Sequence, residues 1–223
     1  MTTIVIATRN AHKVDEIRSI LGGGYQILTL NDIPNPPKVV EDADTFAGNA
    51  TKKAVGLARW LAVTFPPTRH SSPLFVLADD SGLEVDALDG APGVHSARFA
   101  APDSAQSGNT PDANNNAKLL CLLKDVPLKK RRARFHCVIA LVQVPSSKST
   151  VHSPQLFDGA CEGRIIFEPR GKNGFGYDPL FVPVGFEQTF AELGEDVKNK
   201  LSHRARALEK LKKFLEGSAS SLP

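Results

Sequence analysis

One stretch constrains the fold more than any other, because a continuous apolar run leads straight into two carboxylates. The run Phe75–Ala78 is typical of a buried strand in a sheet that is covered on both faces. Asp79 and Asp80 follow it, and Ser81 and Gly82 come next. Successive side chains of an extended chain alternate between faces, so the two carboxylates are predicted to point apart at the end of this strand.

Two interpretations of the carboxylate pair stay open on this stretch alone. Carboxylate oxygens are the ligands that Mg²⁺ prefers, and open α/β sheets bind ligands beyond the carboxyl ends of their strands. The plainer alternative is an ordinary strand followed by a turn in which an Asp side chain bonds to the backbone.

Bulk composition excludes several classes of protein. The chain has 223 residues, of which 41% are hydrophobic and 23% are charged, as in an ordinary globular protein. The net charge is only +3, so we expect neither nucleic acid nor a membrane surface as a partner. The basic run Lys129–Arg132 is local and is expected to be a solvated loop.

Cysteine usage and the lack of long apolar runs point to the cytoplasm. Cys121, Cys137 and Cys161 are too few and too widely spaced for a disulfide framework or a C-x-x-C zinc site. No apolar run reaches the roughly 18 residues that a membrane span needs. The first residues also lack the charged start and long apolar middle of a signal peptide. We therefore expect reduced thiols and a cytoplasmic location.

The N-terminal segment has the pattern of a strand, a polar turn and a helix. Thr3–Ala7 is a predicted strand, Thr8–Lys13 is the turn, and Gly22–Gly24 ends the helix that follows. Free backbone N–H groups at a helix start bind anions, and Lys13 adds a mobile positive charge. A capped polar turn without a ligand is the alternative, and no dinucleotide fingerprint is present.

A second acidic group precedes a long helix that is expected to end near Val63. Glu41, Asp42 and Asp44 are placed to stabilise the start of that helix, or to meet Asp79 and Asp80 as further carboxylates. Inside the helix, Lys53 follows Asn49 by four positions, so the two side chains share a face.

The remaining elements are predicted from apolar periodicity and turn residues. Loops are expected at 64–73, 101–113 and 145–154, and 94–100 is expected to be a short segment carrying Arg98. The predicted strands are Tyr25–Leu30, a strand within Arg132–Val144 and the region Leu156–Phe167, and the predicted helices are Asn114–Leu123 and Asp196 to about Glu216. No repeat or linker is visible, so 1–216 is expected to be one domain, with 217–223 a frayed tail.

Two C-terminal blocks have possible binding chemistry. Three glycines around Phe175 and Tyr177 would let backbone approach a ligand while the rings stack on a planar base, or they form a plain glycine-rich turn. The last predicted helix carries Lys198, Ser202 and Arg206 on one stripe, with His203 and Arg204 on its flank. Such a basic face is usually only solvated.

Five ordered blocks together carry a resemblance to a known family. The chain resembles the inosine/xanthosine triphosphate pyrophosphatases, which hydrolyse deaminated purine nucleotides. One departure is Gly48, where many members carry Glu. The blocks are Thr8-x-Asn10-x-x-Lys13, Glu41-x-x-x-Thr45-Phe46-x-x-Asn49-Ala50-x-x-Lys53-Ala54, Ala78-Asp79-Asp80-Ser81-Gly82-Leu83, Gly174-Phe175-Gly176-Tyr177-Asp178-Pro179 and Lys198-x-x-x-Ser202-His203-Arg204-x-x-Ala207-Leu208.

This resemblance implies a fold and a reaction. The implied fold is α/β: an elongated two-lobed domain with a long, mixed, twisted central sheet flanked by helices, and a nucleotide cleft between the lobes. The implied reaction converts the triphosphates of inosine, deoxyinosine or xanthosine into the monophosphate and pyrophosphate. Family members are typically homodimers, and the same is expected here.

The resemblance also implies roles for individual residues. Glu41 and Asp80 are the expected ligands of Mg²⁺, or of Mn²⁺, and Asp80 is also the expected general base. The other expected substrate contacts fall into two groups. The phosphate and neighbouring contacts are Thr8, Arg9, Asn10, Ala11, His12, Lys13, Lys53 and Ser81; the base contacts are Phe175, Gly176, Tyr177, Asp178, Lys198, His203 and Arg204.

Three alternative functions follow from the same residues. A related septum-inhibitor-type pyrophosphatase would act on other modified nucleotides, although the Phe175–Asp178 and Ser202–Arg204 blocks argue against it. A nucleotide-binding module without catalysis would bind without releasing pyrophosphate. An RNA-associated protein would use the basic run up to Arg134 together with Phe135, and its binding would depend on salt.

Overall fold

The structure of the protein is a computed structural model that describes residues 1–65, 73–102, 108–145 and 151–219. Parts of the three predicted loops, namely 66–72, 103–107 and 146–150, lie outside the described residues. The chain divides into two compact units. Unit 1 contains Met1–Asp80, Val138–Asp158 and Ala207–Pro223, and unit 2 contains Ser81–Cys137 and Gly159–Arg206.

A six-stranded mixed sheet organises the chain, in the order β2-β1-β3-β4-β5-β6. Within unit 1, β1 pairs in parallel with both β2 and β3, and within unit 2, β5 and β6 are antiparallel. The sheet and its flanking helices confirm the predicted α/β class. The strands are β1 (Thr3–Ile6), β2 (Gln26–Thr29), β3 (Leu74–Val85), β4 (Arg132–Gln143), β5 (Gln155–Ile165) and β6 (Phe181–Pro183).

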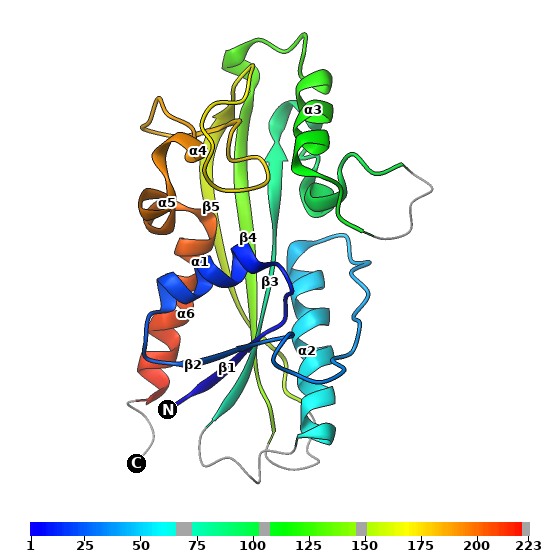
Figure 1. The fold of residues 1–223 in the computed structure, drawn as a ribbon, viewed down its shortest axis with the longest axis vertical. Coiled ribbons are helices and arrows are strands. Elements are labelled where there is room, and N and C mark those ends of the chain that lie inside the picture. The colour runs from blue at the N-terminus through cyan, green and yellow to red at the C-terminus, as the bar shows by residue number, and fades with distance from the viewer. Residues whose placement is uncertain (66–72, 103–107, 146–150, 220–223) are drawn as a thin grey trace. The chain divides into compact units, whose positions relative to one another are not determined.

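In unit 1, helices lie on both sides of the strands (Figure 1). Helix α2 (Phe46–Thr64) lies on one side, and α1 (Ala11–Leu21) and the C-terminal part of α6 (His203–Ala219) lie on the other. The buried face of α2 repeats at helical spacing and is rich in alanine, which lets a helix approach a sheet closely. Its buried residues include Ala50, Ala54, Leu57, Ala58 and Leu61.

The strand that carries the two aspartates is longer than predicted. β3 does not end at Ala78 but runs through Asp79 and Asp80 to Val85. Leu83 and Val85 are fully buried, so the apolar alternation resumes after the acidic pair and keeps the chain extended. The prediction of a strand end at Ala78 is therefore wrong, because both carboxylates have cationic partners within unit 1 that make their burial tolerable.

Unit 2 is built on a core of its own. Its helices are α3 (Asp112–Leu122), α4 (Phe190–Leu193) and α5 (Glu195–Leu201), with 3₁₀ segments at Asp86–Leu88, Gly93–Arg98 and Leu128–Lys130. Helix α3 contributes Leu119, and the aromatic rings of Phe135, Phe181 and Phe190 contact one another. The core contains Leu83, Val85, Leu119, Leu123, Ala133, Phe135, Cys161, Ile165, Tyr177, Leu180, Phe181 and Phe190.

The last predicted helix is interrupted. Helix α5 ends at Leu201, Ser202 has extended backbone angles, and α6 begins at His203. The Ser202 hydroxyl accepts a hydrogen bond from the Ala205 N–H at 3.2 Å, which is the contact of a helix N-cap. A serine that caps a new helix competes with continuation of the preceding one. The prediction that Lys198, Ser202 and Arg206 lie on one stripe of a single helix is therefore wrong.

One arginine of the predicted solvated basic run is buried. Arg131 donates hydrogen bonds to the carbonyl oxygens of Val126, Ile166 and Leu123, and its guanidinium lies over the Phe167 ring. Burial lowers the pKa of Arg131. The Arg131 side chain connects the end of α3 and the turn after it to the end of β5. Its role is therefore structural.

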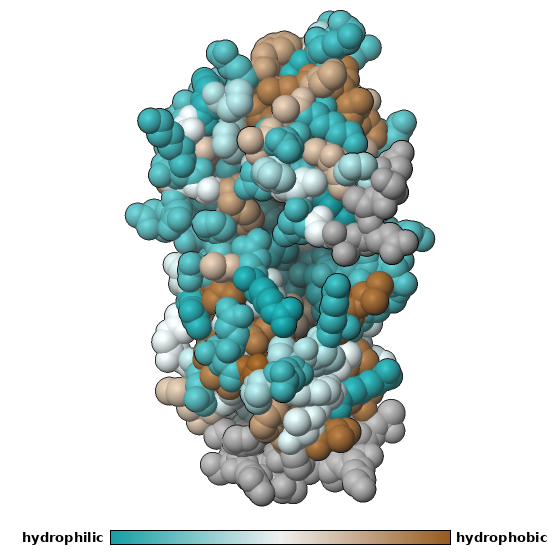
Figure 2. Space-filling view, turned by 45° about the vertical axis from the view of Figure 1, so that its right-hand side comes forward, coloured by the Kyte–Doolittle hydropathy of each residue, from teal (hydrophilic) through white to brown (hydrophobic). Residues whose placement is uncertain are grey.

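Cys121, Cys137 and Cys161 are thiols that form no disulfide bond. Hydrophilic residues cover most of the face drawn in Figure 2. Within the ranges that the structure describes, no helix combines the length and the apolar character needed to cross a membrane.

Candidate active site

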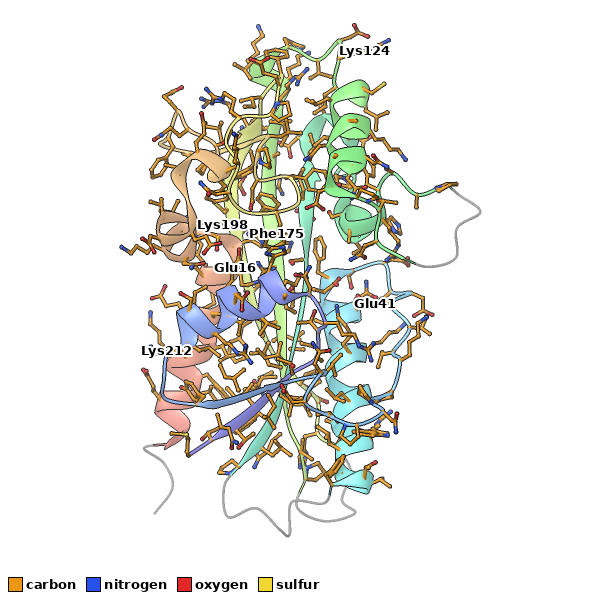
Figure 3. The ribbon with its side chains drawn as sticks, viewed as in Figure 1. Glu16, Glu41, Lys124, Phe175, Lys198 and Lys212 are labelled. Atoms are coloured by element: carbon orange, nitrogen blue, oxygen red, sulfur yellow. The ribbon has the colours of Figure 1, made fainter. Side chains whose placement is uncertain are left out.

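Lys53 lies at the centre of a carboxylate cluster in unit 1. Its ammonium nitrogen Nζ, on α2, is 2.8 Å from Glu41 Oε2 and 2.9 Å from Asp80 Oδ1. It also donates to the backbone oxygen of Asp79 at 2.9 Å. Glu41 is on the segment that precedes α2 (Figure 3). Three oxygens from two distant segments therefore converge on the Lys53 ammonium, a pairing that was not predicted.

The second carboxylate of β3 points the other way. Asp79 Oδ1 is 2.5 Å from the Lys13 ammonium on α1, and the Asp79 side chain is fully buried. The prediction that the neighbouring carboxylates point apart is therefore confirmed. Parallel pairing of β1 with β3 ends at Leu77, so both aspartates lie just beyond the carboxyl end of β1.

Asn49 fixes the orientation of Asp80. Its Nδ2 donates to Asp80 Oδ2 at 3.3 Å and to the Ala43 carbonyl at 3.2 Å, while its Oδ1 accepts from the Ala43 N–H at 2.9 Å. No role was predicted for Asn49, although its spacing of four from Lys53 placed both side chains on one face of the helix. That shared face is the one that meets Asp80.

Burial and charge set the protonation of this cluster. Burial raises the pKa of the Asp80 carboxyl above its ordinary value, against the opposing pull of Lys53 and Lys13. Burial also acts to raise the pKa of Glu41, but Lys53 and Lys13 outweigh it and the pKa is lowered. The pKa of Lys53 is raised, because Asp80 and Glu41 outweigh its burial. Asp80 is thus the carboxylate of this pair whose affinity for a proton is raised by its surroundings.

The polar turn after β1 starts a helix with a side-chain cap. Asn10 Oδ1 accepts from the Lys13 N–H at 3.1 Å, and Thr8 Oγ1 accepts from the Asn10 N–H at 3.1 Å. Arg9, Ala11 and His12 are exposed. The alternative of a capped turn is therefore correct as local structure, and Lys13 already has a carboxylate partner.

The acidic residues before α2 do not cap it. Thr45 is the cap, with its hydroxyl accepting from the Gly48 N–H at 3.0 Å. Glu41 pairs with Lys53, and Asp42 pairs with Lys52 at the surface. A Cβ atom at Gly48 would lie 2.7 Å from the Ala43 Cβ, so a larger residue there requires the preceding turn to shift.

In unit 2, a buried ion pair supports the glycine-aromatic loop. Lys198 Nζ and Asp178 Oδ2 are 2.6 Å apart, and their side chains are 4% and 2% exposed. The same Asp178 oxygen accepts from the Phe175 N–H at 2.9 Å. The Lys198 ammonium also lies 4.3 Å from the centre of the Phe175 ring (Figure 3). Asp178 therefore links the glycine-aromatic loop to the Lys198 ammonium, which lies beside the Phe175 ring.

The two rings of this loop have different environments. Phe175 is half-buried, whereas Tyr177 is only 3% exposed and belongs to the core of unit 2. The Tyr177 hydroxyl donates to the Ser96 carbonyl at 2.9 Å, and burial raises the pKa of this phenol. Phe175 is thus the ring of this loop that has exposed surface to offer a base, and Tyr177 anchors it.

The predicted basic helix face is not solvated. Lys198, His203 and Arg204 are all buried, with Arg204 only 1% exposed. The His203 ring stacks on Phe135 with 4.9 Å between centroids, and an Arg204 guanidinium nitrogen donates to Ser81 Oγ at 2.9 Å. The expectation of a merely solvated face is wrong, because β4 and the unit 2 part of β3 contact His203 and Arg204, while Lys198 pairs with Asp178.

Comparison with known proteins finds relatives over nearly the whole chain. A model of the Ham1 family matches residues 4–214. The chain belongs to the Ham1 family. It is 45% identical over 217 residues to a dITP/XTP pyrophosphatase of Shouchella clausii, with 97% of this chain and 98% of the relative covered. It is 46% identical over 213 residues to a protein of the same name from Desulforamulus reducens, covering 95% and 94%.

Solved structures of Ham1 proteins share the fold. The Coxiella burnetii HAM1 protein superposes with a TM-score of 0.78 at 38% identity, covering 97% of this chain and 100% of the other. The Staphylococcus aureus Ham1 protein gives 0.77 at 34% identity, covering 97% and 99%.

The donor set of this Ham1 chain suits a hard divalent cation. Glu41 and Asp80 supply carboxylate oxygens, and the cation Lys53 is held between them. In the described part of the chain, no three or more His, Cys, Asp or Glu side chains gather as a complete protein cage. Mg²⁺ is commonly bound by one or two carboxylates with substrate phosphates and water completing its shell, so two carboxylates fit it.

Proposed function

We propose that this protein hydrolyses deaminated purine nucleoside triphosphates, such as ITP, dITP and XTP, to the monophosphate and pyrophosphate. The observation that carries the proposal is the convergence of Glu41 and Asp80 on Lys53. The Lys13–Asp79 ion pair is adjacent to it, because Asp79 precedes Asp80 in the chain. Membership of the Ham1 family and the names of the relatives support the substrate class. We further propose one catalytic domain over 1–216, a homodimer and a cytoplasmic location.

The charge of the cluster supports a divalent cation as part of the substrate complex. Three carboxylates, Asp79, Asp80 and Glu41, face two ammonium groups, Lys13 and Lys53. When ionised, this cluster is net negative and would repel a triphosphate. We propose that Glu41 and Asp80 hold Mg²⁺, or Mn²⁺, which when bound would neutralise phosphate charge and lower the pKa of the attacking water.

The side chains of unit 1 then have distinct tasks. Lys13, Lys53 and the exposed start of α1 bind phosphate oxygens, since helix starts and ammonium groups stabilise anions. Asp80 accepts a proton from water as the water breaks the α–β phosphoanhydride and pyrophosphate leaves. Burial raises the pKa of Asp80, which brings it closer to the range in which a general base is effective.

The side chains of unit 2 bind the base. Phe175 stacks on the purine, and donors on Lys198, His203 and Arg204 read its six-position. Hypoxanthine and xanthine present a carbonyl there, which accepts hydrogen bonds, whereas adenine presents an amino group. Buried donors left unpaired by adenine make the wrong substrate costly, so the site would reject ATP.

A pyrophosphate-release panel tests the function. With Mg²⁺ present, the purified protein should release pyrophosphate from ITP, dITP and XTP at least about 100-fold more efficiently than from ATP, in kcat/KM. Release from pyrimidine or other modified nucleotides with equal efficiency would favour the septum-inhibitor-type alternative. Binding of inosine nucleotides without any release would favour a non-catalytic module.

Replacing Arg204 tests base recognition. Because Arg204 is a buried charged donor, Arg204→Ala should raise KM for ITP about 10- to 100-fold. It should also lower the preference for ITP over ATP, measured as the ratio of the two kcat/KM values. Arg206→Ala, at an exposed position of the same helix, is the control. Unchanged selectivity would remove Arg204 from base recognition.

A further inference from the structure

Helix α3 holds both polar groups of the Gly176 backbone. Asp112 Oδ2 accepts from the Gly176 N–H at 2.6 Å, and Asn116 Nδ2 donates to the Gly176 carbonyl at 3.0 Å. Asp112 and Asn116 are four positions apart in one helix, so they share a face. Gly176 has a φ of +62°, a conformation that favours glycine. All three residues belong to unit 2.

The residues on either side of Gly176 are also fixed. The Phe175 N–H donates to Asp178, and the Tyr177 hydroxyl donates to the Ser96 carbonyl. Gly176 itself has no side chain with which to anchor this part of the loop. Asp112 therefore holds the peptide between Phe175 and Gly176, and Asn116 holds the peptide between Gly176 and Tyr177. Together they fix the backbone next to Phe175, and with it where the half-buried ring lies.

We propose that Asp112 and Asn116 are positioning residues for nucleotide base binding. By holding the two peptides that flank Gly176, they set the Phe175 ring in the place where it stacks on the purine. This inference rests on the proposed function, in which Phe175 contacts the base. It adds α3, a helix for which no binding role was predicted, to the elements that determine the specificity of the site.

The environment of Asn116 allows its effect on the loop to be tested separately from its effect on stability. Asn116 is 9% exposed, and among the described residues its buried Oδ1 has no hydrogen-bond partner. A buried acceptor without a partner lowers stability, so this amide is a poor choice for packing alone. A leucine of similar size would remove that cost and also remove the bond to Gly176. Asn116→Leu should therefore keep the fold stable while releasing the loop.

Steady-state kinetics with ITP and Mg²⁺ tests the proposal. Asn116→Leu and Asp112→Ala should each raise KM about 5- to 10-fold with kcat within about twofold, the size expected for one lost hydrogen bond. Asp112→Asn keeps a carbonyl oxygen for the Gly176 N–H and should restore KM to within about twofold of the native value. Asn114→Ala, at an exposed position of α3, should change nothing. The Tm of Asn116→Leu should equal or exceed that of the native protein.

Two inhibitors locate the effect on the base. The inhibition constant of inosine monophosphate should rise with KM in both variants, whereas that of pyrophosphate, which has no base, should stay within about twofold. Unchanged KM and unchanged inosine monophosphate binding in both variants would overturn the proposal, as would an equal weakening of pyrophosphate. If the native protein releases no pyrophosphate, the proposed function fails instead, and calorimetric binding of inosine monophosphate to the same variants still decides the role of α3.

Discussion

Asp80→Asn should strongly reduce the turnover of ITP while leaving the fold intact. The amide cannot accept a proton from water, and general-base catalysis contributes about 10²- to 10⁴-fold, so kcat should fall by at least about 100-fold. The free energy of unfolding should change by no more than about 1 kcal/mol, because the relief of burying a charge offsets the lost charge-assisted bond to Lys53. Pyrophosphate release and urea unfolding measure the two quantities.

The outcome for Asp80 has a matched control. Asp42→Asn removes an exposed carboxylate that pairs with Lys52 and follows Glu41 in the chain, and it should leave both kcat and stability near native values. Near-native turnover by Asp80→Asn would show that another group is the base. A stability loss well above about 1 kcal/mol would mean that Asp80 is chiefly structural.

Asp178→Ala should be among the most destabilising single changes in unit 2. It leaves the buried Lys198 ammonium without its 2.6 Å carboxylate partner and removes the acceptor of the Phe175 N–H. Breaking a buried pair by removing one partner costs about 3–5 kcal/mol, because the remaining charge is uncompensated. Urea unfolding of the variant should show a loss of that size.

A second substitution identifies the cause of the loss. In the double variant Asp178→Ala/Lys198→Met no buried charge remains, so at least about half of the lost stability should return. Selective turnover of ITP should not return, because the Lys198 donor is missing. Asp158→Ala, which breaks an exposed pair with Lys210, should cost less than about 1 kcal/mol. Strictly additive losses in the double variant would contradict this account.

Local patterns were sufficient for the elements around the N-terminus. The apolar spacing and the glycine cluster predicted β1, α1 and the end of that helix at Gly22. Alternation along an extended chain predicted that Asp79 and Asp80 point apart, and Lys13 and Lys53 receive them separately. These features depend on neighbours within a few residues, which is the range over which backbone geometry dictates side-chain direction.

Three features depended on partners far away in the sequence. β3 continues past Ala78 because lysines from α1 and α2 compensate its buried carboxylates. The basic residues after Leu201 are buried because Phe135 and Ser81 contact them, while Ser202 starts a new helix. Propensity could not predict these, since tertiary contacts outweigh it by several times its magnitude.

The sequence by itself determined which residues have the chemistry of the site: the carboxylates, the lysines, the glycine-aromatic loop and the buried cations. Tertiary structure alone decided their pairing, including the convergence of Glu41 and Asp80 on Lys53 and the contacts of Asp112 and Asn116 with Gly176. The physical reason is that hydrogen bonds and ion pairs act over about 3 Å, so they depend on which distant segments the core brings to that separation.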